Sequence, residues 1–375
     1  MCEVLKSNFE EIYPEIEDSI KRSSFIAIDL EFTGLHFEDG CNNNMFDDGA
    51  ERYSKLKKNC QNFTISQIGL AVFRHDTTNS CYTANVFNVF VFPQSCASLD
   101  ERFSCQASSL KFLCQYEFDF NKFIYDGVPF LTHEQEEKLR ALGNPEELLS
   151  TIGGNFFRPI FTSVSVWLRQ AAVDDEMVID ANRGVDILIL QAKLCTMFKE
   201  IWTRSTSKNE VIVMKVSVEK RKVLENTSPA WKSRIIDSLV GFSKVFRLIC
   251  DSKKPVVGHN MLMDLLLMYD KFHNKLPSSW TDFKNELHRI IPNIYDTKHL
   301  ASKCRKILKG YNLATQTNIT DLYELLQSEK GQLAAFNPPT ISLDPKSKHY
   351  GEEKHYHEAG YDAYICGYGM VPGFA

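Results

Sequence analysis

Apolar residues along this chain fall into short β-branched runs and longer helical repeats. Residues 25–28, Phe-Ile-Ala-Ile, are apolar and partly β-branched, which predicts a buried central strand. Residues 63–73 and 82–92 are rich in β-branched and aromatic residues and are separated by a polar turn, so they predict an antiparallel pair beside that strand. Residues 6–21 predict an amphipathic helix that leads into the central strand.

Two further stretches before residue 140 have a mixed character. Residues 36–60 carry acidic, Asn and Gly residues and then a short helical patch, which predicts a loop near the end of the first strand. Residues 108–129 are aromatic with two interspersed lysines. Platforms that stack single-stranded bases use this mixture, but packed helices and loops use it as well, and the pattern leaves both interpretations open.

A change of pattern at about residue 141 predicts a domain boundary. A chain of 375 residues exceeds the size at which a single core usually stops growing, so an insertion or a second domain is expected. Residues 141–240 mix helical and strand patterns and are interrupted by glycines and a proline near their start. We interpret them as a small inserted α/β subdomain between two parts of one larger domain, residues 1–140 and 241–375.

The second informative stretch lies after that insertion. Residues 255–257 predict a short strand, and Asn260 predicts the cap of a helix over 261–272. Asp264 falls early in that helix, where an acidic residue is mildly stabilising. Its neighbours are apolar, however, and a carboxylate among them costs more than one on a charged face. The sequence leaves a structural and a functional role for Asp264 equally open.

Composition and charge set limits without naming a function. A hydrophobic fraction of 43% and a charged fraction of 24% are those of a soluble globular protein. The formal net charge of -5 neither indicates nor excludes nucleic-acid binding, because gripping a few phosphates needs only a local basic groove and metal ions. The 11 cysteines show no C-x-x-C spacing, which predicts reduced thiols in an intracellular protein. No signal-peptide or transmembrane run is found, so a cytoplasmic protein is expected.

Candidate chemistry begins with Asp29 and Glu31 at the exit of the first predicted strand. Side chains alternate along a strand, so residues two apart point to the same face and these two carboxylates project together. Two like charges at a partly desolvated strand end are unfavourable unless a cation holds them, and hard oxygen ligands suit Mg²⁺ or Mn²⁺. Solvated carboxylates at a strand end are the structural alternative.

His357 and Asp362 come from a third stretch near the end of the sequence. Five residues apart, they would be separated by roughly 140° on a regular helix. A shared site therefore needs His357 in the turn before a helix that carries Asp362, and Gly360 favours such a turn. Zinc binding by the histidines of this stretch is disfavoured, because no cysteine accompanies them at ligand spacing. With the three earlier carboxylates, this set matches the needs of two-metal phosphoryl chemistry, which uses carboxylates and a base.

The order of these motifs carries a resemblance to a known family. D-L-E-F-T-G-L, then G-H-N with an Asp four residues beyond the Asn, then H-E-A-G-Y-D resemble the motifs of the DEDDh exonucleases. Segments of the poly(A)-specific ribonuclease family are similar to SQIGLAVF, FNVFVFP, FSCQASSLKFL, FDFNKF, VGHNM, YDTKHLAS and HEAGYDAY. The sequence is most similar to the PARN-like domain-containing branch, whose members trim the 3′ ends of PIWI-interacting RNAs.

The resemblance implies an RNase H-like α/β fold of the DEDD exonuclease type, with a central mixed sheet flanked by helices and a small α/β insertion. It implies a 3′-to-5′ exoribonuclease that uses two Mg²⁺ ions, or Mn²⁺ in their place, and releases 5′-nucleotides from single-stranded RNA. Maturation of PIWI-interacting RNA 3′ ends is the expected role. Poly(A) tail shortening is the first alternative, and a catalytically silent RNA-binding scaffold is the second.

Partners and site residues are implied in the same way. PIWI-type proteins, a homodimer, and a cytoplasmic location in germ granules or at the mitochondrial surface through a partner are expected. The insertion, 141–240, contains no histidine, so it lacks the Arg-x-x-x-His motif of the single-strand-binding module that it resembles. The residues that match functional positions of the family are the metal-binding carboxylates Asp29, Glu31, Asp264 and Asp362, the general base His357, the RNA-contacting Phe32, Thr33 and Leu35, and His259 and Asn260 of the Gly-His-Asn turn.

Overall fold

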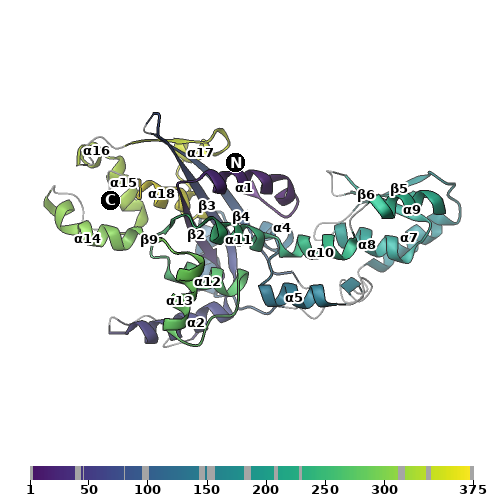
Figure 1. Ribbon diagram of the computed structural model, residues 1–375, viewed down its shortest axis with the longest axis horizontal. Coiled ribbons are helices and arrows are strands. Elements are labelled where there is room, and N and C mark those ends of the chain that lie inside the picture. Colours follow the sequence, from purple (N-terminus) through teal and green to yellow (C-terminus); the bar gives the residue numbers. More distant parts are fainter. Residues whose placement is uncertain are drawn as a thin grey trace. The chain divides into compact units, whose positions relative to one another are not determined.

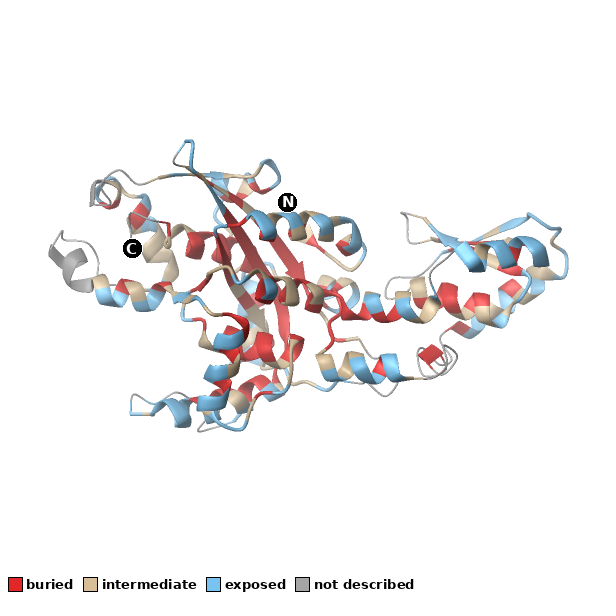
Figure 2. Ribbon diagram, in the orientation of Figure 1, coloured by how far each residue is buried: buried red, intermediate tan, exposed pale blue. Residues whose placement is uncertain are grey.

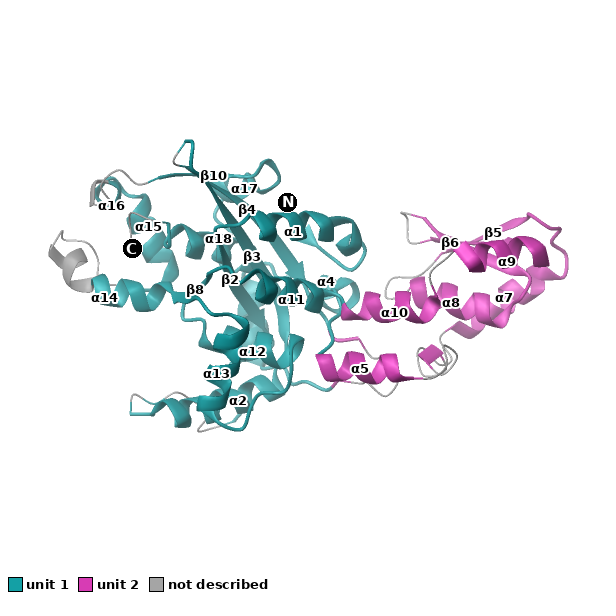
Figure 3. Ribbon diagram, viewed as in Figure 1, with its two compact units in different colours: residues 1–92, 102–132, 241–375 teal, residues 93–101, 133–240 magenta. Residues whose placement is uncertain are grey.

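The computed structural model describes residues 3–38, 44, 46–79, 81–94, 101–142, 148–149, 157–180, 187–206, 210–227, 230–310, 317–334 and 339–371 (Figure 1). Contacts divide the chain into two compact units, which Figure 3 colours separately. Unit 1 comprises residues 1–92, 102–132 and 241–375, and unit 2 comprises residues 93–101 and 133–240.

Unit 2 begins before the predicted boundary at residue 141. Its first helix, α5 (His133–Ala141), is tied to α10 (Trp231–Val240) by an ion pair of 2.7 Å between Arg140 and Asp237. The turn after α5 is held as well, because the Lys232 ammonium donates to the carbonyl of Arg140 at 2.7 Å. These contacts explain why α5 groups with the later residues. The assignment of 141–240 as an inserted subdomain stays a prediction.

Unit 1 is built on one mixed sheet with the strand order β1-β4-β3-β2-β8-β9, and β10 also pairs with β4. The pairs β2–β3 and β3–β4 are antiparallel, whereas β8 and β9 run parallel to β2. The predicted antiparallel pair beside the central strand and the predicted mixed sheet are therefore confirmed. The strands are β1 (Glu3–Val4), β2 (Phe25–Phe32), β3 (Ile65–Asp76), β4 (Cys81–Phe90), β8 (Val256–Gly258), β9 (Ile294–Asp296) and β10 (Thr340–Leu343).

Strand β2 is central because it is apolar on both of its faces. Ile26 and Ile28 point into the larger core cluster, whereas Ala27 points into a second cluster on the other face. Figure 2 shows the strands of this sheet as the buried centre of unit 1. The strand continues to Phe32, so Asp29 and Glu31 lie inside it and not at its exit as the sequence pattern predicted.

Helices cover the two core clusters of unit 1. The larger cluster includes residues of α1, α11, α12 and α13, and the second includes residues of α18. None of the helices that the structure describes is long and apolar enough to span a membrane. The helices of unit 1 are α1 (Phe9–Arg22), α2 (Gly49–Asn62), α3 (Ala107–Gln115), α4 (Phe120–Asp126), α11 (Phe242–Ser252), α12 (Leu262–Phe272), α13 (Trp280–Ile290), α14 (Thr297–Gly310), α15 (Ile319–Gln327), α16 (Glu329–Ala334), the 3₁₀ turn Pro345–Ser347, α17 (His349–Glu352) and α18 (Ala359–Tyr368).

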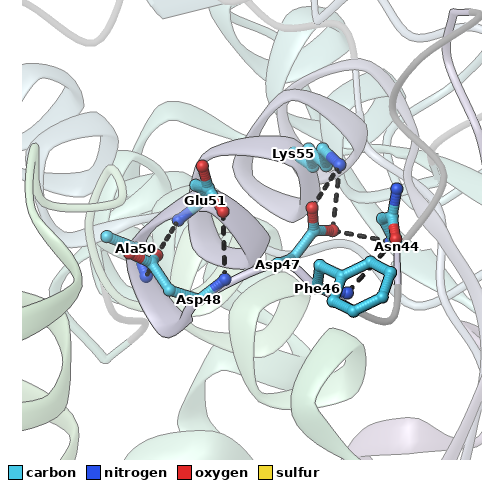
Figure 4. Close-up of polar contacts among 7 residues, drawn as sticks. All are labelled: Asn44, Phe46, Asp47, Asp48, Ala50, Glu51 and Lys55. Atoms are coloured by element: carbon cyan, nitrogen blue, oxygen red, sulfur yellow. Dashed lines mark hydrogen bonds and ion pairs between the residues drawn. The ribbon is translucent and has the colours of Figure 1, made fainter.

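The helical patch predicted within the polar segment after the first strand is α2. Asp48 caps this helix by accepting from the N–H of Glu51 at 2.8 Å, and the Glu51 carboxylate accepts from the N–H of Asp48 at 3.0 Å (Figure 4). This reciprocal capping box satisfies donors at the helix start that would otherwise have no intrahelical partner. Residues 39–43 and 45 of the predicted loop lie outside the described residues.

Unit 2 has a three-stranded antiparallel sheet of its own, in the order β5-β7-β6. Arg221 of α9 ties this helix to the segment before and in β6, because its guanidinium donates to the carbonyls of Cys195, Phe198 and Ile201. Besides α5 and α10, the elements of unit 2 are α7 (Arg158–Leu168), β5 (Glu176–Asp180), α8 (Ile187–Met197), β6 (Ile201–Ser205), β7 (Glu210–Lys215) and α9 (Val218–Thr227).

Gly69 of β3 marks the closest approach of α18 to the sheet. A Cβ atom built on Gly69 would lie 1.7 Å from the carbonyl oxygen of Ala359, so no larger residue fits there. Gly69 pairs with Asp29 on one side and with Asn88 on the other. The missing side chain therefore lets the N-terminus of α18 lie directly against the strand that carries the candidate carboxylates.

Gly69→Ala is expected to lower the free energy of unfolding by about 1–3 kcal/mol, because the added methyl group overpacks a buried contact with backbone. Gly369→Ala is the matched control at the other end of α18, where a built Cβ lies 3.4 Å from its nearest neighbour, an ordinary contact. Urea unfolding of the two variants and the parent protein measures the difference. Equal stabilities of the two variants would show that α18 does not press on β3 as described.

Candidate active site

Three elements bring the four candidate carboxylates together. Asp29 and Glu31 lie on β2, Asp264 in the first turn of α12, and Asp362 in the first turn of α18. Burial raises the pKa of Asp29 and of Glu31 well above the usual value, and the charges of Asp362 and Asp264 raise both pKa values further. Charges influence one another to this extent only when they lie close together in a poorly hydrated site.

Asp264 and Asp362 are almost completely removed from solvent, with exposed fractions of 9% and 6%. Burial raises the pKa of each to about 7, against hydrogen bonds from backbone N–H groups that lower it. A carboxylate that stays charged in such surroundings needs a positive partner. Asp264 does lie at a helix start, the structural role that the sequence left open, but mild stabilisation of that helix does not offset the burial of its carboxylate.

His357 occupies the turn directly before α18, as its spacing from Asp362 predicted. Its backbone N–H donates to Oδ2 of Asp362 at 3.2 Å, and its ring Nδ1 lies 4.0 Å from the same oxygen. The turn is made differently from the prediction, because Gly360 is already inside the helix and His357 itself has a left-handed φ of 65°. This conformation costs roughly 1–2 kcal/mol for a residue with a side chain, and such strain concentrates at functional sites.

Phe112 of α3 and Tyr116, the residue directly after this helix, contact the His357 ring. The ring centroid of Tyr116 lies 4.2 Å and that of Phe112 lies 4.7 Å from the imidazole. Burial lowers the pKa of His357, which favours the neutral imidazole. The sequence did not single out Phe112 or Tyr116, although the aromatic pattern of 108–129 contained both. Of the later aromatics of that stretch, Phe118 packs against Phe90, whereas Tyr125 is exposed.

The segment after β2 is held in place by its own polar groups. Thr33 is fully buried, and its hydroxyl donates to the carbonyl of Ser104 at 2.9 Å. The N–H of Leu35 donates to Oε1 of Gln106 at 2.9 Å, while 48% of the Leu35 residue surface stays exposed. Phe32 is half-buried and packs against the larger core cluster. Of the three residues matched to RNA contact, Leu35 is the one whose side chain is open to solvent.

The Gly-His-Asn turn differs from its predicted arrangement. Asn260 is not the cap of α12, whose N-cap is Met261 without a side-chain hydrogen bond. The carboxylate of Asp296, at the end of β9, instead accepts from the N–H of Asn260 at 3.1 Å and from that of Met261 at 3.0 Å. Nδ1 of His259 lies 2.9 Å from the hydroxyl of Thr297. Asp296 and Thr297 fall in the YDTKHLAS segment, to which the sequence gave no role.

The residues present fit divalent cations. Oδ1 of Asp362 is buried and has no hydrogen-bond partner among the described residues, although such oxygens are usually satisfied. One ligand atom each from Glu31, His357 and Asp362 lies within 4.8 Å of the others, a spacing that one ion can span. The hard oxygens of four carboxylates match the preference of Mg²⁺ and Mn²⁺. Metal binding by these residues stays a prediction.

The metal-free protein is expected to become more stable as the pH falls from 8 to 5.5. Folded-state pKa values of about 7 for Asp264 and Asp362 lie above the unfolded value of about 3.9 for Asp, so the folded protein binds protons more tightly. The stability that this contributes is fully present below about pH 4 and is lost as the pH rises through about 7.

Thermal unfolding in the presence of EDTA tests this expectation, with Asp264→Asn as the comparison. The variant has one carboxylate fewer, so its unfolding temperature should change less with pH than that of the parent. Mg²⁺ should restore more stability to the parent at pH 8 than at pH 5.5. A parent protein that is most stable at pH 8 without metal would contradict the described repulsion.

A mixed sheet with four converging carboxylates and a histidine fits the class of metal-dependent nucleases. The model of the family described as CAF1 family ribonuclease matches residues 4–370. The chain therefore belongs to the CAF1 family of ribonucleases.

Curated relatives match over nearly the whole chain. Poly(A)-specific ribonuclease PNLDC1 of Mus musculus is 36% identical over 369 residues, which are 96% of this chain and 68% of that protein. The pre-piRNA 3′-exonuclease trimmer of Bombyx mori is 30% identical over 98% of this chain and 70% of that protein. Poly(A)-specific ribonuclease PARN of Xenopus laevis is 33% identical over 97% of this chain and 61% of that protein. The chain thus spans about two thirds of the length of these relatives.

Among solved structures, the RNase domain of the yeast Pop2 protein is similar, with a TM-score of 0.45 and 13% identity over 97% of this chain and 81% of that one. The predicted family, the α/β fold with a central mixed sheet flanked by helices, and the enzyme class, a 3′-to-5′ exoribonuclease, are confirmed. The roles of individual residues stay predictions.

Proposed function

We propose that this chain shortens single-stranded RNA from its 3′ end with the help of two Mg²⁺ ions, or Mn²⁺ in their place, and releases 5′-nucleotides. The observation that carries the proposal is the convergence of four largely buried carboxylates from three elements beside His357. Asp29, Glu31, Asp264 and Asp362 would hold the ions. No carboxylate of the set is missing, which argues against a catalytically silent scaffold.

His357 acts as the general base in this proposal. A neutral imidazole accepts a proton from the attacking water, and the lowered pKa of His357 keeps the ring neutral near pH 7. The hydrogen bond from its N–H to Asp362 fixes the turn that carries the ring. When bound, the ions supply Lewis-acid charge that stabilises the transferring phosphate.

The RNA end would lie across an apolar rim formed by Leu35, Phe112 and Tyr116. Their exposed fractions are 48%, 40% and 44%, and the two aromatic rings stand beside His357. Stacking of a base on an aromatic side chain contributes about 1–3 kcal/mol and tolerates any base. Because the Thr33 hydroxyl is used internally, we expect Thr33 to shape the segment and not to touch the RNA.

The precursor of a PIWI-interacting RNA is the substrate that we propose. One relative over 98% of this chain is named as a pre-piRNA 3′-exonuclease trimmer. Relatives named as poly(A)-specific ribonucleases support poly(A) shortening as the second candidate. Within this proposal, a PIWI-type protein presents the RNA end in the cytoplasm, in germ granules or at the mitochondrial surface, and the enzyme works as a homodimer. Under matched conditions, a trimmer should degrade mixed-sequence RNA as fast as oligo(A), whereas a deadenylase should prefer oligo(A).

A 2′-O-methyl group on the last nucleotide is expected to slow degradation by about 5- to 150-fold. Methylation removes a hydrogen-bond donor and leaves its acceptor in the site unsatisfied, which costs roughly 1–3 kcal/mol. Single-turnover decay of two RNAs that differ only in this methyl group measures the effect. An internal 2′-O-methyl group far from the 3′ end provides the control. Identical decay of the terminally methylated and unmethylated RNAs would show that the last ribose is not read.

A further inference from the structure

Helix α18 begins without a side-chain cap of its own. Its N-cap residue is Glu358, whose side chain makes no hydrogen bond to the first N–H groups of the helix. The Glu358 carboxylate is turned away, because one oxygen accepts from the hydroxyl of Tyr350 and the other lies 3.7 Å from Nδ1 of His355. The donors at the start of this buried helix must therefore find partners elsewhere.

Two amide side chains of the sheet supply these partners. Oε1 of Gln67 on β3 accepts from the N–H of Ala359 at 3.0 Å. Oδ1 of Asn88 on β4 accepts from the N–H of Gly360 at 3.1 Å. Both side chains are buried, with residue exposures of 3% and 2%. A polar side chain buried to this degree is expensive unless it makes hydrogen bonds, and these bonds fix the first turn of α18 on the sheet.

The strand register places both amides next to the candidate active site. Gln67 stands opposite Glu31, and Asn88 stands opposite Gly69, which in turn stands opposite Asp29. Residues directly opposite in antiparallel strands point to the same face, so the amides share the face of the two β2 carboxylates. Gly69 between them leaves space for the backbone of α18.

The choice of amides has a physical reason. A carboxylate would cap a helix at least as well, because it accepts hydrogen bonds and its charge favours the helix N-terminus. At this face, however, the charges of Asp264 and Asp362 already raise the pKa of Asp29 and Glu31. An amide oxygen accepts the same hydrogen bond without adding a further negative charge.

We propose that Gln67 and Asn88 are positioning residues of the active site. By holding the first turn of α18, they fix where His357 and Asp362 stand relative to the two carboxylates of β2. This inference rests on the proposed function, because it assumes that His357 and Asp362 take part in the reaction. Neither amide touches the RNA in this account, so their loss slows turnover and leaves binding of the RNA end intact.

The test replaces each amide by an apolar residue of similar size. Gln67→Met and Asn88→Leu remove the acceptors, and a displacement of about 1 Å at reacting groups can cost on the order of 10²-fold in rate. We expect kcat to fall about 10- to 100-fold at saturating Mg²⁺, with KM for a single-stranded RNA changed by less than about twofold. Asn88→Asp keeps an acceptor oxygen in either protonation state and should restore slow hydrogen exchange of the Gly360 N–H to that of the parent. Its kcat is not a criterion, because the aspartate can add the negative charge that the amide avoids.

Asn85 provides a matched control on the same strand. Its amide donates to the hydroxyl of Ser19 at 3.1 Å and does not contact α18, so Asn85→Leu removes a β4 amide of the same kind while kcat stays unchanged. Hydrogen exchange of the peptide spanning 356–363 gives a readout that does not depend on activity. Exchange at Ala359 and Gly360 should accelerate in Gln67→Met and Asn88→Leu, and remain as in the parent in Asn85→Leu.

Several results would overturn the inference. These are an unchanged kcat in both acceptor-removing variants, a rise in KM without a fall in kcat, or an equal loss in Asn85→Leu. If Asn88→Leu does not fold, kcat and KM of Gln67→Met and the exchange pattern of Asn88→Asp decide. Failure of the proposed function would look different. The parent protein itself would release no nucleotides from RNA, whereas hydrogen exchange at Ala359 and Gly360 could still accelerate in Gln67→Met and Asn88→Leu.

Discussion

Asp264→Asn is expected to lower exonuclease turnover by about 10³-fold while leaving the fold intact. The substitution keeps the size of the side chain and one acceptor oxygen but removes one of the charges proposed to hold the metal ions. Charge stabilisation of the transferring phosphate then falls, and the loss of one such preorganised interaction costs on the order of 10²- to 10³-fold or more. Single-turnover degradation of a 5′-labelled RNA across a range of Mg²⁺ concentrations measures the change.

The stability of the same variant is expected to change in the opposite direction. Without metal, removal of one carboxylate relieves the repulsion that raises the pKa of Asp29 and Glu31, so Asp264→Asn should unfold at a higher temperature than the parent. Asp251→Asn, on the exposed surface of α11, is the control and should change neither the turnover nor the unfolding temperature. Near-normal turnover of folded Asp264→Asn protein would contradict the assignment of this carboxylate.

His357→Ala is expected to lower turnover by about 10²- to 10⁴-fold, the usual contribution of a positioned general base. Metal affinity should hardly change, because the four carboxylates remain. His288→Ala, an exposed histidine of α13, is the control. Since a ring nitrogen of His357 lies near Glu31 and Asp362, an equal loss of metal affinity would make His357 a ligand instead of the base.

The pH dependence of the parent protein follows from the same assignment. Burial lowers the pKa of His357 from its ordinary value of about 6.5, and the base works only when it is neutral. At saturating Mg²⁺, activity should therefore rise with pH, with a midpoint below pH 6.5, and then level off. This rise should be absent from the residual activity of His357→Ala. A midpoint well above pH 6.5 would show that burial is not the dominant influence on the pKa of His357.

Local patterns in the sequence were sufficient to find the central strand and its carboxylates. Phe25 to Ile28 could be recognised because apolar β-branched residues favour strands, and the spacing of Asp29 and Glu31 placed them on one face. The spacing of His357 and Asp362 likewise predicted a turn before a helix, which the structure confirms. These features depend on neighbouring residues alone.

Features that depend on contacts between distant segments were missed or misassigned. Asn260 was expected to cap α12 on local grounds, but Asp296, 36 residues away, takes the N–H groups of that turn. Gly360 was expected to form the turn before α18, but His357 forms it with a left-handed φ. Tertiary contacts here override the local preference for glycine. The capping role of Gln67 and Asn88 requires the strand register, which no local pattern of polar residues contains.

The central claim is that the four carboxylates and His357 form the active site of a 3′-to-5′ exoribonuclease. Its most direct test uses a single-stranded RNA that carries a labelled phosphate between its last two nucleotides. With Mg²⁺, the parent protein should release the label first and as a 5′-mononucleotide, and Asp264→Asn and His357→Ala should not do so at a comparable rate. Three results would contradict the account. The label could leave within an oligonucleotide, it could leave only after the RNA has been shortened from its 5′ end, or the two variants could release it as fast as the parent.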